Sequence, residues 1–192
     1  MRKIIIFASG SGTNAENIIN FFHNARPQTA KIDALYSNNT DAYALVRAAN
    51  LGVPTRVFGK KEWVEGNIIF DELLTRQPDV IVLAGFLWLV PQAIVDAFPR
   101  RIVNIHPALL PQYGGRGMYG HHVHEAVKAA GERQSGITIH YVSAEYDRGD
   151  AIFQATCELL PTDTPDDIAA RIHELEQAHF PRVIAGLVAG LG

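Results

Sequence analysis

Asn104 and His106 are the residues whose types and spacing most clearly point to chemistry, in the run Asn-Ile-His-Pro that ends a short apolar stretch. On an extended strand, residues two apart share a face, and Pro107 would stop the strand directly after them. An amide beside an imidazole can polarise a carbonyl group and stabilise the oxyanion that forms when it is attacked. Alternatively, Asn104 and a half-buried His106 have only a structural role. The position of the pair at a strand end before a glycine-rich loop favours the catalytic role.

A carboxylate that could assist this pair occurs in the run Glu-Tyr-Asp-Arg-Gly-Asp at 145–150. Asp147 and Asp150 are equally good candidates by composition. A carboxylate in such a segment is usually a solvated residue that stabilises a turn. The residues alone therefore leave the choice between the two open, and they do not place either one near His106.

The run Gly-Ser-Gly-Thr-Asn-Ala at 10–15 follows the first apolar stretch and precedes a helical pattern. Such a turn presents free backbone N–H groups at the positive end of a helix, which predicts an anion site. Its spacing also fits the dinucleotide form G-x-G-x-x-[GA], but that function expects an acidic residue after the second strand, where Ser-Asn-Asn stands at 37–39. With the hydroxyls of Ser11 and Thr13 nearby, one terminal phosphate is favoured over a dinucleotide. A tight turn that binds nothing is the remaining interpretation.

Three close histidines, His121, His122 and His124, raise the question of a metal site. Their spacing does not fit one helical face, and the chain has neither an H-E-x-x-H run nor a cysteine-rich pattern. We expect no metal and place these histidines in a loop or on the surface. Residues 85–90, which follow an apolar strand, are predicted to be either core or the wall of an apolar pocket.

The elements that must position these residues follow an alternating pattern. Short apolar runs predict strands at 4–8, 32–36, 55–58, 80–84 and 102–105, and periodic stretches predict helices at 14–22, 41–50 and 63–76, with Asn14 as the first N-cap. This alternation indicates a doubly wound, mostly parallel α/β sheet with a Rossmann-like N-terminal half. The glycine-rich loop 107–120 follows a strand's carboxyl end, the edge of such a sheet where ligands bind.

The pattern changes after residue 130. Two strand-like runs, 136–142 and 151–158, flank a polar turn and predict a hairpin that extends the sheet. A final helix is expected over about 165–189, broken at Pro181, because proline removes a helical hydrogen bond.

Composition narrows the class of protein. The 192 residues favour one domain over 1–192, and 47% hydrophobic with 19% charged residues excludes a disordered chain. The net charge of −3 predicts no general attraction to nucleic acid or to an anionic membrane surface. The longest apolar run, 80–90, is too short to span a bilayer. One cysteine, Cys157, excludes an internal disulfide and fits a reducing compartment, so we expect a soluble, cytoplasmic protein.

Four runs in this order give the chain a family resemblance: Gly-Thr-Asn at 12–14, Leu-Ala-Gly-Phe at 83–86, Asn-Ile-His-Pro-Ala-Leu-Leu-Pro at 104–111 and Tyr-Asp-Arg-Gly at 146–149. With them the sequence resembles the folate-dependent formyltransferases, and among these the phosphoribosylglycinamide formyltransferases of purine synthesis. The resemblance covers essentially the whole chain.

The resemblance implies a transfer of a formyl group from 10-formyltetrahydrofolate to the amine of glycinamide ribonucleotide, without a metal or a covalent intermediate. It implies the catalytic residues Asn104, His106 and Asp147, and so selects Asp147 over Asp150. It also implies that Gly12, Thr13 and Asn14 hold the substrate phosphate and that Glu176 binds the glycinamide end. The pterin of the folate would lie against Phe86, Leu87, Trp88, Leu89 and Val90, with His140, Val142 and Ser143 in the same cleft. The implied partners are these small molecules, for a monomer or a homodimer.

Three features depart from the family's usual pattern. Thr13 stands where serine is common, Trp88 replaces an arginine common in the pterin wall, and the loop 113–122 is longer than in the commonest members. Related alternatives are a methionyl-tRNA formyltransferase, a formyltetrahydrofolate hydrolase and a sugar-nucleotide formyltransferase. The chain length and the net charge disfavour the first, which normally carries an extra domain and a basic balance. A dinucleotide-binding module is the alternative from a different class.

Overall fold

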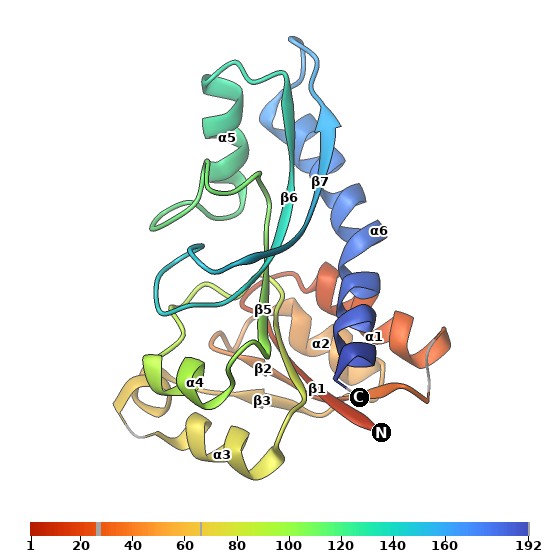
Figure 1. Cartoon of the computed structure of the whole chain (residues 1–192), viewed down its shortest axis with the longest axis vertical. Coiled ribbons are helices and arrows are strands. Elements are labelled where there is room, and N and C mark those ends of the chain that lie inside the picture. Colours follow the sequence, from red (N-terminus) through yellow and green to blue (C-terminus); the bar gives the residue numbers. More distant parts are fainter. Residues whose placement is uncertain (26–27, 66, 192) are drawn as a thin grey trace.

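The computed structural model describes residues 1–25, 28–65 and 67–191, and within them it forms a seven-stranded sheet (Figure 1). The strand order is β3-β2-β1-β4-β5-β6-β7. The strands are β1 (Arg2–Phe7), β2 (Ala30–Ser37), β3 (Thr55–Val57), β4 (Val80–Leu83), β5 (Ile102–His106), β6 (Gln134–Tyr141) and β7 (Ala151–Glu158). Strands β1 to β5 pair in parallel and β6 and β7 join antiparallel, which confirms the mostly parallel sheet and the hairpin that extends it.

Helices cover both faces of this sheet. Alternate residues of β1 separate the two cores: Ile4 and Ile6 pack on one face, and Ile5 and Phe7 on the other. The first face is covered by α1 (Thr13–Asn24), α2 (Tyr43–Asn50), α5 (His121–Ala129) and α6 (Pro165–Gly190), and the second by α3 (Ile68–Arg76) and α4 (Gln92–Ala97). This is the doubly wound arrangement expected of strands that alternate with helices.

The first helix does not begin as the sequence pattern predicts. Its N-cap is Gly12 and not Asn14, and no side chain caps it. Gly12 has a φ of 77°, in the left-handed region that favours glycine. A Cβ at Gly12 would lie 2.5 Å from the Cα and Cβ of Ala44, because the turn packs directly against α2. The glycine therefore allows a tight turn and a close approach of two backbones.

Helix α6 continues through Pro181, so the expected break is wrong. Proline at 181 removes the N–H that would bond to the carbonyl of Gln177. Asn17 of α1 donates its side-chain N–H to that carbonyl at 2.9 Å instead. The helix begins at a capping box in which Thr164 and Asp167 exchange hydrogen bonds. No helix within the described residues is both long and apolar enough to cross a membrane.

Other differences concern short helices. The stretch predicted as one helix over 63–76 is a π-helical turn, η1 (Lys61–Glu65), followed by α3, and residue 66 lies outside the described residues. Helix α2 begins at Tyr43, later than expected. Helix α4 was not predicted, because its six residues are too few to show a clear apolar period. Helix α5 was missed because its first turn, His121 to His124, was assigned to a loop or the surface. The expectation that His121, His122 and His124 lie in a loop or on the surface is partly wrong, since they form the first turn of α5 and His124 is buried.

Candidate active site

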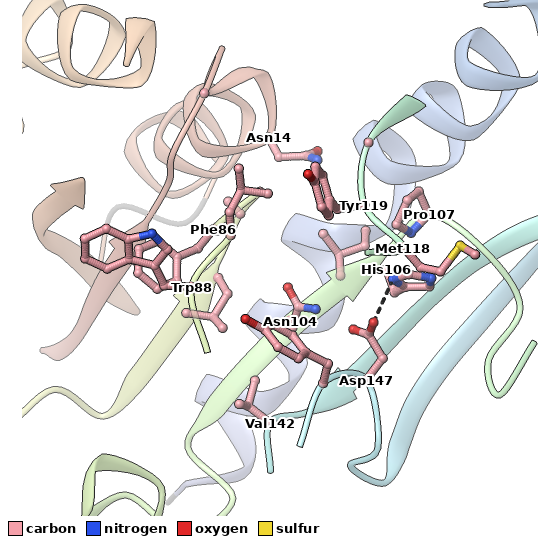
Figure 2. Close-up of a pocket in the computed structure, with 18 of the residues that line it drawn as sticks. Asn14, Phe86, Trp88, Asn104, His106, Pro107, Met118, Tyr119, Val142 and Asp147 are labelled. Atoms are coloured by element: carbon pink, nitrogen blue, oxygen red, sulfur yellow. Dashed lines mark ion pairs between the residues drawn. The ribbon is translucent and has the colours of Figure 1, made fainter. Parts of the chain in front are cut away.

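A cavity of about 780 Å³ lies at the carboxyl ends of β1, β4 and β5, where open α/β sheets bind ligands (Figure 2). This volume suits a small-molecule site. The structure brings every site residue expected from the sequence to its wall: Asn104, His106, Asp147, Gly12, Thr13, Asn14, Glu176, Phe86, Leu87, Trp88, Leu89, Val90, His140, Val142 and Ser143.

The imidazole of His106 lies between two acceptors. Its Nε2 is 2.7 Å from the carbonyl oxygen of Tyr113, and its Nδ1 is 3.5 Å from Oδ2 of Asp147 (Figure 2). Because a carbonyl oxygen only accepts hydrogen bonds, Nε2 must carry the ring proton, and its N–H donates a hydrogen bond to the Tyr113 carbonyl. Burial lowers the pKa of His106, while the Asp147 charge and the Tyr113 carbonyl act to raise it. The net shift is downward, so the resting imidazole is neutral at neutral pH.

Asp147, and not Asp150, lies beside His106. Burial acts to raise the pKa of Asp147, but His140, His106 and the N–H of Gly115 together lower it below its ordinary value. The Gly115 N–H donates to Oδ2 at 3.0 Å. Asp147 is therefore an ionised carboxylate at neutral pH, whereas the exposed Asp150 pairs with Arg100 at 3.2 Å and lies outside the cavity wall.

Asn104 is held across the sheet by His140. The two residues are opposite each other in the antiparallel pair of β5 and β6. The Nδ1 of His140 lies 2.9 Å from the carbonyl of Tyr141, so this nitrogen carries the ring proton. The Nε2 of His140 then accepts from Nδ2 of Asn104 at 3.1 Å. One N–H of the amide is thereby fixed, and the other remains for a ligand in the cavity.

The turn at 10–14 leaves backbone N–H groups free at the start of a helix. Helix α1 begins directly after Gly12 without a side-chain cap, so the N–H groups of its first turn have no intrahelical acceptor. Arg47 of α2 donates to the carbonyl of Ser11 at 3.0 Å and supports the turn from outside. A dinucleotide site would need an acidic residue at the end of β2. Ser37 stands there instead, and the next acidic residue along the chain, Asp41, is exposed.

The side chain of Asn14 is already occupied. Its Nδ2 donates to Oε2 of Glu176 at 2.9 Å, and its Oδ1 accepts from Gln177 at 3.2 Å. His173 also lies 3.4 Å from Oε2 of Glu176, and this contact raises the pKa of the histidine. Asn14 can therefore offer an anion its backbone N–H, while its amide joins the turn to α6.

An aromatic cluster supports the apolar wall after β4. Phe86 packs against Phe7 and Trp63 with ring centroids 5.3 Å and 5.4 Å apart, and Trp88 packs against Phe58. The indole N–H of Trp63 donates to the carbonyl of Leu89 at 2.9 Å. The wall combines buried side chains (Phe86 and Val90) with exposed ones (Leu87 and Leu89), as an apolar ligand site requires.

Sequence reasoning missed one side of the cavity. The loop after β5 and helices α5 and α6 contribute Arg116, Met118, Tyr119, His124 and Ile172. Figure 2 shows Met118 and Tyr119 on the side of His106, across from Phe86 and Trp88. The glycine-rich composition of the loop was the available signal for this wall. Among the described residues, no group of three or more His, Cys, Asp or Glu side chains is placed to hold a metal ion.

The formyl transferase family matches this chain over residues 2–184. The chain belongs to that family. Its relative from Haemophilus influenzae, named phosphoribosylglycinamide formyltransferase, is 36% identical over 99% of this chain and 89% of its own length. A chloroplastic enzyme of the same name from Arabidopsis thaliana is 37% identical over 97% of this chain. The chain spans 65% of that plant relative's length.

Solved structures of the family share the fold. The glycinamide ribonucleotide transformylase 1 of Symbiobacterium toebii superposes with a TM-score of 0.89 and 31% identity, covering 99% of this chain and 89% of its own. The mostly parallel sheet and its flanking helices therefore share the fold of this solved structure.

Proposed function

We propose that this member of the formyl transferase family transfers the formyl group of 10-formyltetrahydrofolate to the amine of glycinamide ribonucleotide. Relatives over nearly the full chain are named for this activity. The observation that carries the proposal is that Asn104, His106 and Asp147 share one cavity with an uncapped helix start that suits a phosphate. The amine attacks the formyl carbon, the bond from this carbon to the folate nitrogen breaks, and a proton passes from the amine to that nitrogen.

The acceptor substrate would enter with its phosphate on the turn. The backbone N–H groups of Gly12, Thr13 and Asn14, with the hydroxyl of Thr13, supply donors to a phosphate dianion. Glu176, tied to the same turn through Asn14, offers a carboxylate to the donors of the substrate's glycinamide end. These contacts would anchor the substrate so that its amine reaches the region of Asn104.

The pterin of the folate would lie against the wall formed by Phe86 to Val90, with His140, Val142 and Ser143 completing the cleft. The apolar side chains and the backbone groups of this wall fit a flat heterocycle. Positioning two substrates in one cavity converts a bimolecular encounter into a local reaction, which is a large part of the expected rate gain.

Asn104 would be the donor most directly available to the oxyanion. His140 holds one of its amide N–H bonds, which leaves the other for the formyl oxygen. The Nε2–H of His106 donates a hydrogen bond to the carbonyl of Tyr113. This hydrogen bond must break before Nε2–H can contact the formyl oxygen. As negative charge develops on the oxygen, Nδ1 can take up the amine proton, and the Asp147 charge beside it stabilises the protonated ring until this proton passes to the folate nitrogen.

Asp147 would assist the loss of the amine proton. Its low pKa keeps it ionised, and it would reach the amine proton through one bridging water molecule. No thiol is needed, and burial raises the pKa of the single Cys157. We further propose one domain over 1–192 and a cytoplasmic monomer or homodimer that binds no nucleic acid, membrane or metal.

The test is a steady-state assay of the purified chain with 10-formyltetrahydrofolate and glycinamide ribonucleotide, with both products identified by mass. Formylated ribonucleotide that appears in step with tetrahydrofolate supports the proposal. Release of formate without an acceptor would instead support a hydrolase. Tight binding of NAD(P) with no ribonucleotide binding would contradict the proposal and support a dinucleotide module.

A further inference from the structure

His124 is a buried histidine in the cavity wall to which the mechanism above gives no function. It lies in the first turn of α5, it is 6% exposed, and it lines the same cavity as Tyr119, Ile172 and Glu176. Its neighbours His121 and His122 are half-exposed and pair with acidic residues on the surface. The contrast shows that His124 alone of the three turns inward.

The ring of His124 has no hydrogen-bond partner in the described part of the chain. Its Nδ1 is sealed from solvent without a partner. Buried N–H groups are almost always hydrogen-bonded, so Nδ1 is the nitrogen without a proton and the N–H of the neutral ring lies at Nε2. The Nε2 is not sealed in this way, and because the residue lines the cavity, this edge of the ring is the one that a ligand can reach.

The charge state of the ring decides what it can offer. Burial lowers the pKa of His124, while Glu176 acts to raise it and His121 and His106 act to lower it. The neutral ring has one N–H, and only at Nε2 can this proton meet an acceptor that enters the cavity. His124 therefore presents a neutral donor toward the cavity.

Glu176 supplies the complementary group. Its Oε2 is engaged by Asn14 and His173, whereas Oε1 has no hydrogen bond within the residues that the structure describes. A donor and an acceptor that line one cavity suit sugar hydroxyls, each of which both donates and accepts. His124, Glu176 and His106 line the same cavity, and Glu176 is tied through Asn14 to the turn at 10–14.

We propose that His124 donates a hydrogen bond from Nε2 to a ribose hydroxyl of the acceptor ribonucleotide and so selects for an intact ribose. This inference rests on the proposed function, which supplies a substrate with its ribose between the phosphate and the amine. His124 is a binding residue in this arrangement, and it takes no part in the chemical step.

The test compares variants at position 124 whose side chains differ in length and in whether they carry a hydrogen-bond donor. The amide nitrogen of His124→Gln can approach the place of Nε2, whereas His124→Asn is too short and His124→Phe has no donor. We expect the last two to raise KM for the ribonucleotide about 5- to 10-fold, the effect of one neutral hydrogen bond, with kcat and the folate KM unchanged. His124→Gln should recover most of the loss. The matched control is His122→Phe, on the exposed side of the same helix.

Ribonucleotide analogues that lack the 2′- or the 3′-hydroxyl identify the contact. One of them should bind the parent protein about 5- to 10-fold more weakly, and His124→Phe should show no further loss with that analogue. Equal losses for His124→Phe with the full substrate and with both analogues would overturn the hydroxyl contact. An unchanged KM in His124→Phe would overturn the inference altogether. A parent protein without formyl transfer would instead refute the proposed function. Because His124→Phe removes the sealed polar atom, its thermal unfolding should match or exceed that of the parent.

Discussion

The Nε2 atom of His140 lies 3.1 Å from the Nδ2 atom of Asn104, across the antiparallel pair of β5 and β6. The two residues come from opposite sides of a long loop and helix α5, and the strand register makes them direct neighbours. The orientation of the proposed oxyanion donor is therefore set by a second strand. In this relationship Asn104 is the residue proposed to contact the substrate, and His140 is the residue that holds Asn104 in place.

The first prediction concerns Asn104 itself. Asn104→Ala removes the donor that is available to the formyl oxygen, and loss of one such donor should lower kcat roughly 100- to 1000-fold. The KM values should change little, because the oxyanion exists only after attack. Steady-state formyl transfer measures the effect, and a variant within a few-fold of the parent would contradict the role of Asn104.

The second prediction concerns His140 as a positioning residue. His140→Phe removes the acceptor for Asn104 while keeping a ring in the cavity wall, and we expect kcat to fall about 10-fold, the effect of one hydrogen bond. If His140 acts through Asn104, the double variant with Asn104→Ala should be no slower than Asn104→Ala alone. Because His140 also lies 3.6 Å from Asp147, additive losses in this double-mutant cycle would show that it acts through that carboxylate and not through Asn104.

The third prediction separates the two carboxylates of the β6–β7 turn. Asp147→Asn removes the charge that acts to raise the pKa of His106, so that pKa should fall further below its ordinary value. Histidine titrations by NMR check this direction, and kcat should fall with it. Asp150→Asn is the control, because Asp150 has an 80% exposed side chain outside the cavity wall. A larger effect from Asp150→Asn would contradict the site.

The fourth prediction concerns the phosphate turn. Gly12→Ala should destabilise the fold by roughly 1–2 kcal/mol through left-handed strain and by about 1–3 kcal/mol more through its contact with Ala44. Gly52→Ala is matched in φ but has open space around its Cβ, so only the first cost should apply. Chemical denaturation measures both. Gly12→Ala should also raise the ribonucleotide KM, whereas Gly52→Ala should not.

The fifth prediction is a loss of stability at mildly acidic pH. The pKa values of His106 and His124 are lowered from 6.5 mainly by burial, so the folded state binds fewer protons there than the unfolded state. Their contribution is therefore complete above about pH 6.5 and is lost as pH falls through the folded pKa values. His173, with a raised pKa, acts in the opposite sense. His124→Phe should weaken the pH dependence of the denaturation midpoint below about pH 6.5, and an unchanged pH dependence would refute this assignment.

Much of the sheet could be predicted from local pattern. The apolar runs at 4–8, 80–84 and 102–105 correspond to β1, β4 and β5, because strands buried on both faces need continuous apolar residues. Helix ends were less predictable. The start of α1 at Gly12 depends on its contact with α2, and the continuity of α6 through Pro181 depends on a hydrogen bond from Asn17. Neither partner is near in sequence.

The sequence by itself determined the paired Asn104 and His106, the glycine turn before the first helix and the family resemblance, because these depend on residue type and short spacing. The family resemblance selected Asp147 over Asp150, but only the tertiary structure places Asp147 beside His106, since the turn geometry decides which carboxylate enters the cavity. It also turned His124 inward while His121 and His122 remained outside, because packing of α5 against the sheet and α6 selects one face of a helix. Burial and charge at such positions arise from segments distant in the chain, which no local spacing encodes.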